Sequence, residues 1–444
     1  MLSQQTRFGT MIGSGYRVVY ENTKIIEREE GIELGLPFFI QSANITTPFI
    51  NEGALSCVSE SEWIRYPKGR IIPGEILVEV KGKAEKVAIV PDDFPVRTLV
   101  TGTCFKITPI SPSHRSLMLA YLMSTHGAVL KNRLKTNLLV SYIAKDDLYR
   151  LPFPIISEAL RLAIHKTVEA SLNCRKEILG KRSEAEGALL EALGLAGWTP
   201  PEPLTYSAQA IDTLKAARLD AQYFMPSKLE MIAALQSMPG EPLGTRFRSV
   251  RDMLDPARAD PDLLVRNFDL PDALEPILDD EKELVPCAEV GSLKKTMQNG
   301  DVAMSRLRAY LKETAVVRTG STHPAIGSSE FIILRAIDPQ TNRIAPETLM
   351  IFLSSGPVQT ILKWCQDGSQ HPRFSERDLL AIPVPEVVAD ASSQIEAMVL
   401  SAFAARSRSR ALLSAAKRAV EIAIEHGEAA ALASLTEQSI LGAH

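Results

Sequence analysis

The chain carries the stretch Leu151-Pro152-Phe153-Pro154 and repeats its pattern as Ile382-Pro383-Val384-Pro385. We name these two stretches the Pro corners. A long segment with the residue spacing of a helix follows each corner, and Ile164 and Ile395 stand at the same distance from their corners. A matching corner followed by a matching helix in each half predicts that the chain contains one structural unit twice.

Two further pairs of segments agree with this duplication. Upstream of the corners, Pro73-Gly74-Glu75-Ile76-Leu77-Val78 matches Asn299-Gly300-Asp301-Val302-Ala303-Met304. Between these turns and the corners, Tyr121-Leu122-Met123-Ser124-Thr125-His126-Gly127 matches Ile351-Phe352-Leu353-Ser354-Ser355-Gly356. All the pairs occur in the same order in both halves. Two copies of a recognition unit suit a partner that itself has two similar half-sites.

Composition places the chain among ordinary globular proteins. Its 444 residues, 45% hydrophobic and 23% charged, predict two or three domains with apolar cores. No apolar run is long enough to cross a bilayer, and the start has no hydrophobic stretch typical of a secretory signal. The five cysteines are scattered and never spaced as Cys-x-x-Cys, which argues against zinc and against disulfides. We therefore expect a cytoplasmic protein with reduced, buried thiols.

Charge is distributed unevenly along the second half. The net charge of −4 does not favour a free-standing nucleic-acid binder, which is usually basic. Basic residues nevertheless predominate between residues 294 and 318, and acidic residues predominate between 269 and 289. Either the second half has a positive edge beside a negative one, or these are unrelated solvated faces.

Two long helices are predicted after the corners. Apolar residues recur at steps of three and four from residue 157 to 193 and from 392 to 426, a narrow stripe typical of a helix that packs on one other helix. Gly194 and Gly427 follow, as glycine often does just past a helix C-terminus. Each helix would be about 50 Å long at 1.5 Å per residue. Between the copies, a Pro-rich linker at 198–203 precedes an amphipathic stretch at 208–235.

In these features the chain resembles the DNA-specificity subunit of Type I restriction-modification systems, over roughly residues 30 to 426. The resemblance rests on the paired Gly-acid turns, the Pro corners, the long helices, and the run from Asp367 to Leu380 before the second corner. The short leader and the long linker around residues 218–224 depart from the family and fit a divergent member, such as a phage-defence variant. The resemblance implies an α+β fold in which two duplicated mixed α/β target-recognition domains are separated by two long antiparallel coiled-coil helices.

The resemblance also gives the domain boundaries. They are a first target-recognition domain at 1–153, a first spacer helix at 154–194, a linker with an amphipathic helix at 195–240, a second target-recognition domain at 241–384, a second spacer helix at 385–427, and a C-terminal tail at 428–444.

Catalytic motifs are weak. Glu79-Val80-Lys81 could hold a metal for phosphodiester cleavage, but the matching positions of the second half are Ser305-Arg306-Leu307, which lack the carboxylate and the lysine. The chain has no Asn/Asp-Pro-Pro-Tyr/Phe motif for a flipped base, no Gly-rich turn for a methyl donor, and no nucleotide-binding P-loop. We expect a non-catalytic chain that binds no metal and no cofactor.

Loops in equivalent places of the two halves carry side chains that can reach DNA. Arg and Lys suit guanine and phosphate, and Asn and Gln suit adenine. For any single residue, a solvated surface role is as good an explanation. The candidates are Lys81, Lys83, Lys86, Lys131, Arg133, Lys135 and Asn137 in the first half, and Arg306, Arg308, Tyr310, Lys312, Gln370, His371 and Arg373 in the second.

The two predicted helices would set the distance between the recognition domains and would support the binding of partner subunits. A rod of about 50 Å spans about fifteen base pairs at 3.4 Å each, so a bipartite target with an unread gap is expected. The resemblance implies double-stranded DNA, two methyltransferase subunits that bind S-adenosylmethionine, and a restriction or translocase subunit as partners. We expect the helix stripes to meet each other and to support partner binding: Leu160, Ile164, Val168, Ile395, Val399 and Phe403. The alternative is a defence-system scaffold or effector-binding protein that does not read DNA.

Overall fold

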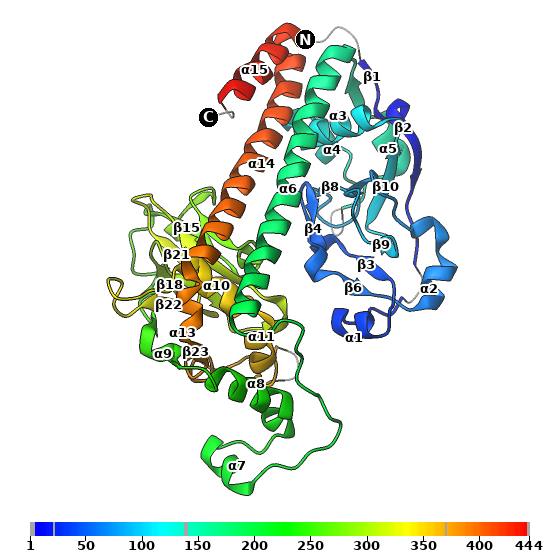
Figure 1. The fold of residues 1–444 in the computed structure, drawn as a ribbon. Helices are drawn as coiled ribbons and strands as arrows, with labels where there is room; N and C mark the ends of the chain where they lie inside the picture. Colours follow the sequence, from blue (N-terminus) through cyan, green and yellow to red (C-terminus); the bar gives the residue numbers. More distant parts are fainter. Residues whose placement is uncertain (1–4, 21–22, 137–140, 369–370, 442–444) are drawn as a thin grey trace. The chain divides into compact units, whose positions relative to one another are not determined.

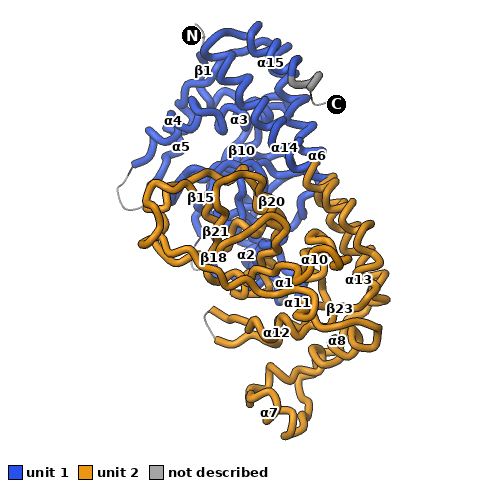
Figure 2. Tube along the Cα trace, turned by 90° about the vertical axis from the view of Figure 1, so that its left-hand side faces the viewer, with its two compact units in different colours: residues 1–176, 405–444 blue, residues 177–404 orange. Residues whose placement is uncertain are grey.

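The computed structural model describes residues 5–20, 23–136, 141–368 and 371–441. The chain forms two compact units (Figure 2). Unit 1 comprises residues 1–176 and 405–444, and unit 2 comprises residues 177–404. Each unit holds one of the two copies expected from the sequence and one end of each long helix. The boundary between the units therefore falls inside the helices, not at the Pro corners.

The first copy is built on an antiparallel sheet with the strand order β2-β10-β7-β8. A smaller sheet has the order β6-β3-β9, and β3 runs parallel to β9. The bounds are β2 (Ile12–Tyr16), β7 (Ile76–Glu79), β8 (Val87–Ile89) and β10 (Cys104–Pro109), with β3 (Phe38–Ile40), β6 (Ser56–Cys57) and β9 (Thr98–Val100) in the smaller sheet. Short pieces β4 (Ile45–Thr46) and β5 (Phe49–Ile50) and helices α1 (Arg28–Glu33) and α2 (Glu60–Arg65) complete this part.

The second copy repeats these pairings and adds strands to both sheets, among them β16, which runs parallel to β20. Its main sheet has the order β13-β22-β19-β20-β16, and in its second sheet β15 runs parallel to β21, as β3 does to β9. The main-sheet strands are β13 (Phe247–Ser249), β16 (Ile277–Asp279), β19 (Val302–Ser305), β20 (Thr314–Arg318) and β22 (Phe331–Ala336). The second sheet contains β14 (Met253–Leu254), β15 (Leu264–Phe268), β17 (Leu284–Pro286), β18 (Lys294–Met297) and β21 (Ala325–Ser328).

Both main sheets are buried on two faces, because the side chains of a strand alternate between its faces. On β7, Ile76 and Val78 join the core that includes α3 (Pro112–Met123), whereas Leu77 joins the core of the smaller sheet. On β19, Val302 and Met304 likewise face α10 (Pro346–Ser354), and Ala303 faces the second sheet. Each copy is thus a helix layer, a main sheet and a second sheet. The other helices here are α4 (Thr125–Arg133), α5 (Lys145–Arg150), α11 (Gly356–Lys363) and α12 (Glu376–Leu380).

The Pro corners are short strands that close each copy. β11 (Pro152–Pro154) pairs antiparallel with β1 (Gln5–Arg7) at the start of the chain. β23 (Pro383–Pro385) pairs antiparallel with β12 (Gly240–Pro242). A two-stranded ribbon consists only of edges, where proline is tolerated. The corners therefore tie the last residues of each copy to its first.

The matching Gly-acid turns have one structural role in both copies. Gly74 and Gly300 adopt φ values of 84° and 89°, which a side chain would disfavour. The following acids, Glu75 and Asp301, each accept a hydrogen bond of 2.8 Å from the backbone N–H three residues upstream. Both carboxylates are buried.

Each buried acid is neutralised from the neighbouring strand. The Lys106 ammonium on β10 lies 2.9 Å from Glu75 Oε1. The Arg335 guanidinium on β22 donates to both Asp301 oxygens at 2.7 Å. A buried carboxylate without such a partner would be strongly unfavourable, so this motif serves the fold.

The two long helices, α6 (Glu158–Ala192) and α14 (Ser392–His426), each contain 35 residues and run antiparallel (Figure 1). In unit 1, the Ser157 N–H donates to Glu428 at 2.9 Å, and Ser171 contacts Ser409 at 2.8 Å. A glycine with positive φ follows the end of each helix, 64° at Gly194 and 93° at Gly427.

The prediction that the apolar stripes at the starts of the two long helices meet each other is wrong. Leu160, Ile164 and Val168 do not meet Ile395, Val399 and Phe403, because antiparallel helices pair the start of one with the end of the other. In unit 1 the first set packs with Ala415, Ala416, Ala419, Val420 and Ala423. In unit 2 the second set packs with Ala185, Leu189 and Leu193.

The amphipathic pattern of the linker predicted one helix, but the linker forms shorter separate pieces. It contains α7 (Ala210–Ala216), a 3-10 turn (Ala221–Phe224) and α8 (Pro226–Gln236). Ala217, with φ of 54°, ends α7, and Pro226 starts α8. The remaining helices are α9 (Leu243–Arg246), α13 (Glu386–Asp390) and α15 (Glu428–Leu441). No helix in the described part of the chain is both long enough and apolar enough to cross a membrane.

Candidate nucleic-acid interface

In each copy, the loop that follows the Gly-acid turn and its strand contacts the segment before the Pro corner, and we call the two a loop pair. In the first copy, Lys81 forms a β-bridge with Tyr142, and the Gly82 N–H donates to the Ser141 carbonyl at 3.0 Å. In the second copy, Leu307 forms the matching bridge with Arg373, and the Arg308 N–H donates to the Pro372 carbonyl at 2.9 Å. The same backbone frame thus holds two sets of side chains at the ends of β7 and β19.

Tight turns shape both loops. Gly82 and Arg308 occupy the same place in the frame, and both have positive φ, 96° and 50°. Ala84 and Lys312 follow with φ of 53° each. Residues other than glycine rarely adopt this conformation, and when they do the surrounding structure holds them there. The described parts of the two loop pairs thus share a turn with positive φ at Gly82 and Arg308, whereas the side chains that they present differ between the copies.

In the first copy, three of the candidate cations are exposed: Lys81, Lys83 and Arg133. Two others are tied to neighbours. Lys86 Nζ donates to the Ser42 carbonyl at 2.7 Å, and Lys135 Nζ lies 3.7 Å from Glu85 Oε1. The exposed three are the groups of this loop pair that a phosphate or a base edge can reach.

The prediction that Lys131 is a loop residue that can reach DNA is wrong. Its side chain is 1% exposed, because it lies in the last turn of α4 on the side that faces the core. Nζ donates to the Glu85 carbonyl at 2.7 Å, and burial lowers the pKa of this amine to about 8. Lys131 therefore holds the 81–86 loop from beneath and does not contact DNA.

Glu79 has a similar internal role. Its Oε2 accepts the backbone N–H groups of Glu85 at 3.0 Å and Lys86 at 3.3 Å, and the carboxylate is buried. These bonds fix the return of the loop and engage Oε2, one of the two oxygens that the nuclease interpretation would assign to a metal. Among the residues that the structure describes, no three His, Cys, Asp or Glu side chains are grouped so that they could hold a metal ion.

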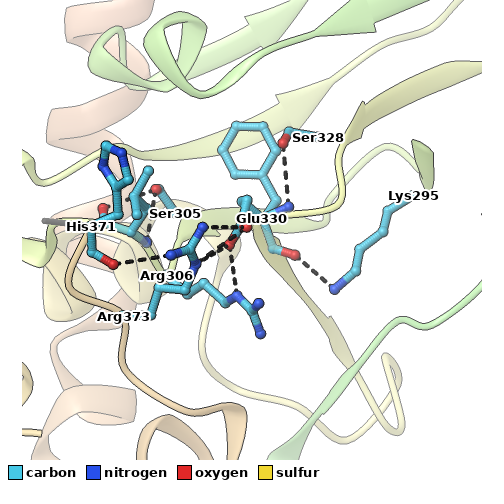
Figure 3. Close-up of polar contacts among 9 residues, drawn as sticks. Lys295, Ser305, Arg306, Ser328, Glu330, His371 and Arg373 are labelled. Atoms are coloured by element: carbon cyan, nitrogen blue, oxygen red, sulfur yellow. Dashed lines mark hydrogen bonds and ion pairs between the residues drawn. The ribbon is translucent and has the colours of Figure 1, made fainter. Parts of the chain in front are cut away.

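The second copy gathers its arginines around one carboxylate, Glu330 (Figure 3). Arg306 Nε lies 2.8 Å from Glu330 Oε2, and Arg373 Nη2 lies 2.9 Å from Oε1. Hydrogen bonds from Arg373 and then Arg306 lower the pKa of Glu330 to about 2, against the opposing effect of its burial. The cluster carries one positive charge in excess, and it stands at the point where the two loops join.

The remaining candidates of this copy surround the cluster. The Arg308 guanidinium lies 3.0 Å from His371 Nδ1. Tyr310 and Lys312 are exposed on the same loop. Asn137 and Gln370 lie outside the described residues.

Sequence reasoning missed several members of the site. Glu330 immediately precedes β22, and its counterpart in the first copy is Thr103, because each carbonyl accepts the equivalent loop N–H. Tyr142 occupies the place of Arg373, and the Arg17 guanidinium lies 5.1 Å from the centre of its ring. Residue-by-residue alignment of the two copies across β10 and β22 was the signal that could have pointed to Glu330.

The prediction that six apolar helix residues support partner binding is also wrong. Leu160, Ile164, Val168, Ile395, Val399 and Phe403 are buried in the cores of this chain. They hold each helix pair and its recognition copy together, so their side chains are not on a surface that a second subunit could contact.

No protein-family model and no curated protein matches the chain. Its fold is similar to that of solved proteins from restriction-modification systems. The S subunit of a Type-I restriction-modification system from M. genitalium is 12% identical, with a TM-score of 0.38 over 94% of this chain and 95% of that one. The HsdS subunit from Thermoanaerobacter tengcongensis is 13% identical, with a TM-score of 0.28 over 96% and 97%.

A third structure, described as the structural basis of complex assembly and conformational transition of the type I R-M system, is 15% identical. Its TM-score is 0.27 over 94% of this chain and 97% of that one. Similarities at this level assign no role to any residue of the present chain.

Proposed function

We propose that this chain is a sequence-specific DNA-binding subunit that reads a bipartite target and directs methyltransferase and restriction subunits to it. The observation that carries the proposal is the loop pair built twice on the same backbone frame with different side chains. A protein that reads two unlike half-sites needs one scaffold for both and different groups at the ends of its loops.

The chemistry of the exposed loop residues supports DNA as the ligand. Lys81, Lys83 and Arg133 suit phosphate oxygens and guanine, and phosphate contacts supply position and much of the affinity. In the second copy, Arg306 and Lys312 offer the same groups. The two copies share the frame but not the side chains, so the two half-sites should differ in sequence.

The non-enzymatic alternative is a scaffold or effector-binding protein of a defence system. It is favoured by the internal ties of Lys131, Lys86 and Arg373, which leave fewer exposed cations than the sequence suggested, and by the net charge of −4. On our proposal, the partner subunits supply further positive surface around the DNA.

The partners follow from the resemblance of the sequence to Type I specificity subunits. We propose two methyltransferase subunits, each binding S-adenosylmethionine, and a restriction or translocase subunit. The chain itself would bind no cofactor and catalyse no reaction, and it would act in the cytoplasm, where its DNA is.

The test is methylome sequencing of cells that carry the methyltransferase subunits of its own system with or without this chain. We expect one bipartite methylated motif that depends on the chain. A chimaera in which residues 306–312 are exchanged for another loop should change one half of the motif and keep the other. Assembly with the partner subunits without any methylated motif or sequence-dependent DNA binding would favour the scaffold.

A further inference from the structure

Glu330 holds its two arginines in different ways. Arg373 is fully engaged: Nε and Nη2 donate to Glu330, and Nη1 donates to the His371 carbonyl at 3.0 Å. Arg306 donates to Glu330 through Nε, and among the described residues its two terminal nitrogens have no partner (Figure 3). Arg373 is therefore held through all three of its guanidinium nitrogens. Arg306 is held through Nε alone, which leaves its two terminal nitrogens to contact a ligand.

We propose that Arg306 reads a guanine in the half-site bound by the second copy, with Glu330 and Arg373 as the residues that position it. This inference rests on the proposed function and names the base-reading residue of one half-site. It also separates Arg306 from Arg373, which the sequence placed together as equal DNA contacts.

The geometry suits guanine because the Nε bond holds the Arg306 guanidinium while its terminal N–H donors remain available to a ligand. A guanidinium is planar, so the bond from Nε to Glu330 orients the whole plane and leaves two parallel N–H donors at its far end. Guanine presents two acceptors, O6 and N7, side by side in the major groove, and arginine bound to both is the commonest specific contact in protein–DNA complexes. A side chain that is already ordered loses less conformational freedom on binding.

Charge and exposure agree with this role. Arg306 is 41% exposed, enough for its end to reach a ligand, and Glu330 is 26% exposed. The carboxylate balances one of the two guanidinium groups, so one positive charge remains to attract DNA. Because hydrogen bonds from Arg373 and then Arg306 lower the pKa of Glu330 to about 2, the carboxylate stays ionised at neutral pH.

The first copy has no such arrangement. The residues in the places of Arg306, Glu330 and Arg373 are Val80, Thr103 and Tyr142, as the matching backbone bonds of the two frames show. The proposed guanine contact therefore belongs to one half-site only, which gives the test an internal control.

The experiment measures binding of the complete complex, with its methyltransferase subunits, to bipartite DNA duplexes that carry each base at each position of both half-sites. We expect Arg306→Ala to reduce discrimination at one G·C position of one half-site by roughly 10- to 100-fold. Arg306→Lys, which keeps the charge but not the two-pronged donor, should lose the same discrimination with a smaller loss of overall affinity.

Further variants separate positioning from stability. Glu330→Gln should weaken discrimination at the same position, because it releases the plane of Arg306 while leaving its donors in place. The matched control is Arg343→Ala, which removes an exposed arginine of the same unit that pairs with Asp390 at 2.7 Å. It should change nothing. Circular dichroism should show that all variants are folded.

Two results would overturn the inference. If Arg306→Ala leaves every base preference intact, or weakens binding equally to all sequences, Arg306 is not the base reader. If the unaltered complex itself binds no DNA sequence-specifically, the proposed function fails with it. A bipartite preference that survives in all variants refutes only the role of Arg306.

Discussion

Ser171 Oγ on α6 lies 2.8 Å from Ser409 Oγ on α14, in the buried seam between the two helices within unit 1. The Ser409 hydroxyl also lies 3.2 Å from the Ser171 carbonyl, to which it donates. Both side chains are buried, and the neighbouring seam is formed by apolar residues such as Val168. A polar pair that is satisfied in only one alignment disfavours sliding of the two helices, as buried polar residues do in other helix pairs.

Ser409→Ala should destabilise unit 1 by about 1–3 kcal/mol, since it leaves the buried Ser171 hydroxyl without its partner. Ser171→Ala should cost less, because the Ser409 hydroxyl still donates to the backbone carbonyl of residue 171. The double variant should cost less than the sum of the two, because both polar groups are then gone. Urea denaturation of the four proteins of this cycle is the measurement. Ser407→Ala, at an exposed position of α14, is the control and should have little effect. Simple additivity would mean that the two hydroxyls do not interact.

Much of the architecture could be predicted because it is encoded in local patterns. The Gly-acid turns, the Pro corners and the periodicity of the long helices identified the duplicated unit and the two helices, whereas the antiparallel packing was implied by the resemblance to Type I specificity subunits. The partners of the corner strands could not be predicted. β1 and β12 lie far from β11 and β23 along the chain, and a three-residue strand carries no pattern that selects its partner.

The candidate site could be predicted at the level of loops but not of side chains. The sequence placed candidate loops at equivalent positions of the two copies, but it did not predict the contacts within each copy that the β-bridges at Lys81 and Leu307 make. It could not separate Lys83, which is exposed, from Lys131, which is buried. Both are lysines in polar surroundings, and the difference depends on how α4 packs on the sheet.

Asp301→Asn should destabilise unit 2 by about 3–5 kcal/mol, because it breaks a buried ion pair and leaves the charge of Arg335 without its partner. The measurement is urea denaturation followed by the fluorescence of Trp198 and Trp364, which both lie in unit 2, in a Trp63→Phe background. Asp390→Asn is the control. It removes an exposed partner of Arg343 and should cost no more than about 1 kcal/mol. Equal effects of the two variants would contradict the structural role of Asp301.

Lys131→Met should change how the stability of unit 1 depends on pH. Burial lowers the pKa of Lys131 from 10.5 to about 8. Below pH 8 the amine is charged in both states, so its desolvation penalty is fully present. Between pH 8 and 10.5 the unfolded chain binds more protons, so the free energy of unfolding rises with pH, by on the order of 3 kcal/mol at most. Above pH 10.5 the rise ends.

The Met variant should lack this rise, and the difference between the two proteins isolates the contribution of Lys131. Urea denaturation can be followed through Trp63, which lies in unit 1, after Trp198 and Trp364 are replaced by Phe. Parallel curves for the two proteins between pH 8 and 10.5 would show that Lys131 is solvated in the folded chain.

Part of the affinity for DNA should not depend on the base sequence, because it comes from contacts with phosphates. Lys81 and Lys83 are exposed on the first loop pair, whereas Lys135, on the neighbouring segment, lies 3.7 Å from Glu85. Each lysine that neutralises a phosphate releases a counterion, so the slope of log affinity against log salt should become shallower by about 1 for each contact removed.

We expect the double variant Lys81→Gln and Lys83→Gln to lower the affinity of the assembled complex for all duplexes alike and to reduce the slope by about 2. Lys135→Gln should change the slope little, because its charge is already balanced. Fluorescence anisotropy over a series of salt concentrations measures both quantities. A slope unchanged by the double variant, or a loss confined to one DNA sequence, would show that these two lysines do not contact the phosphate backbone.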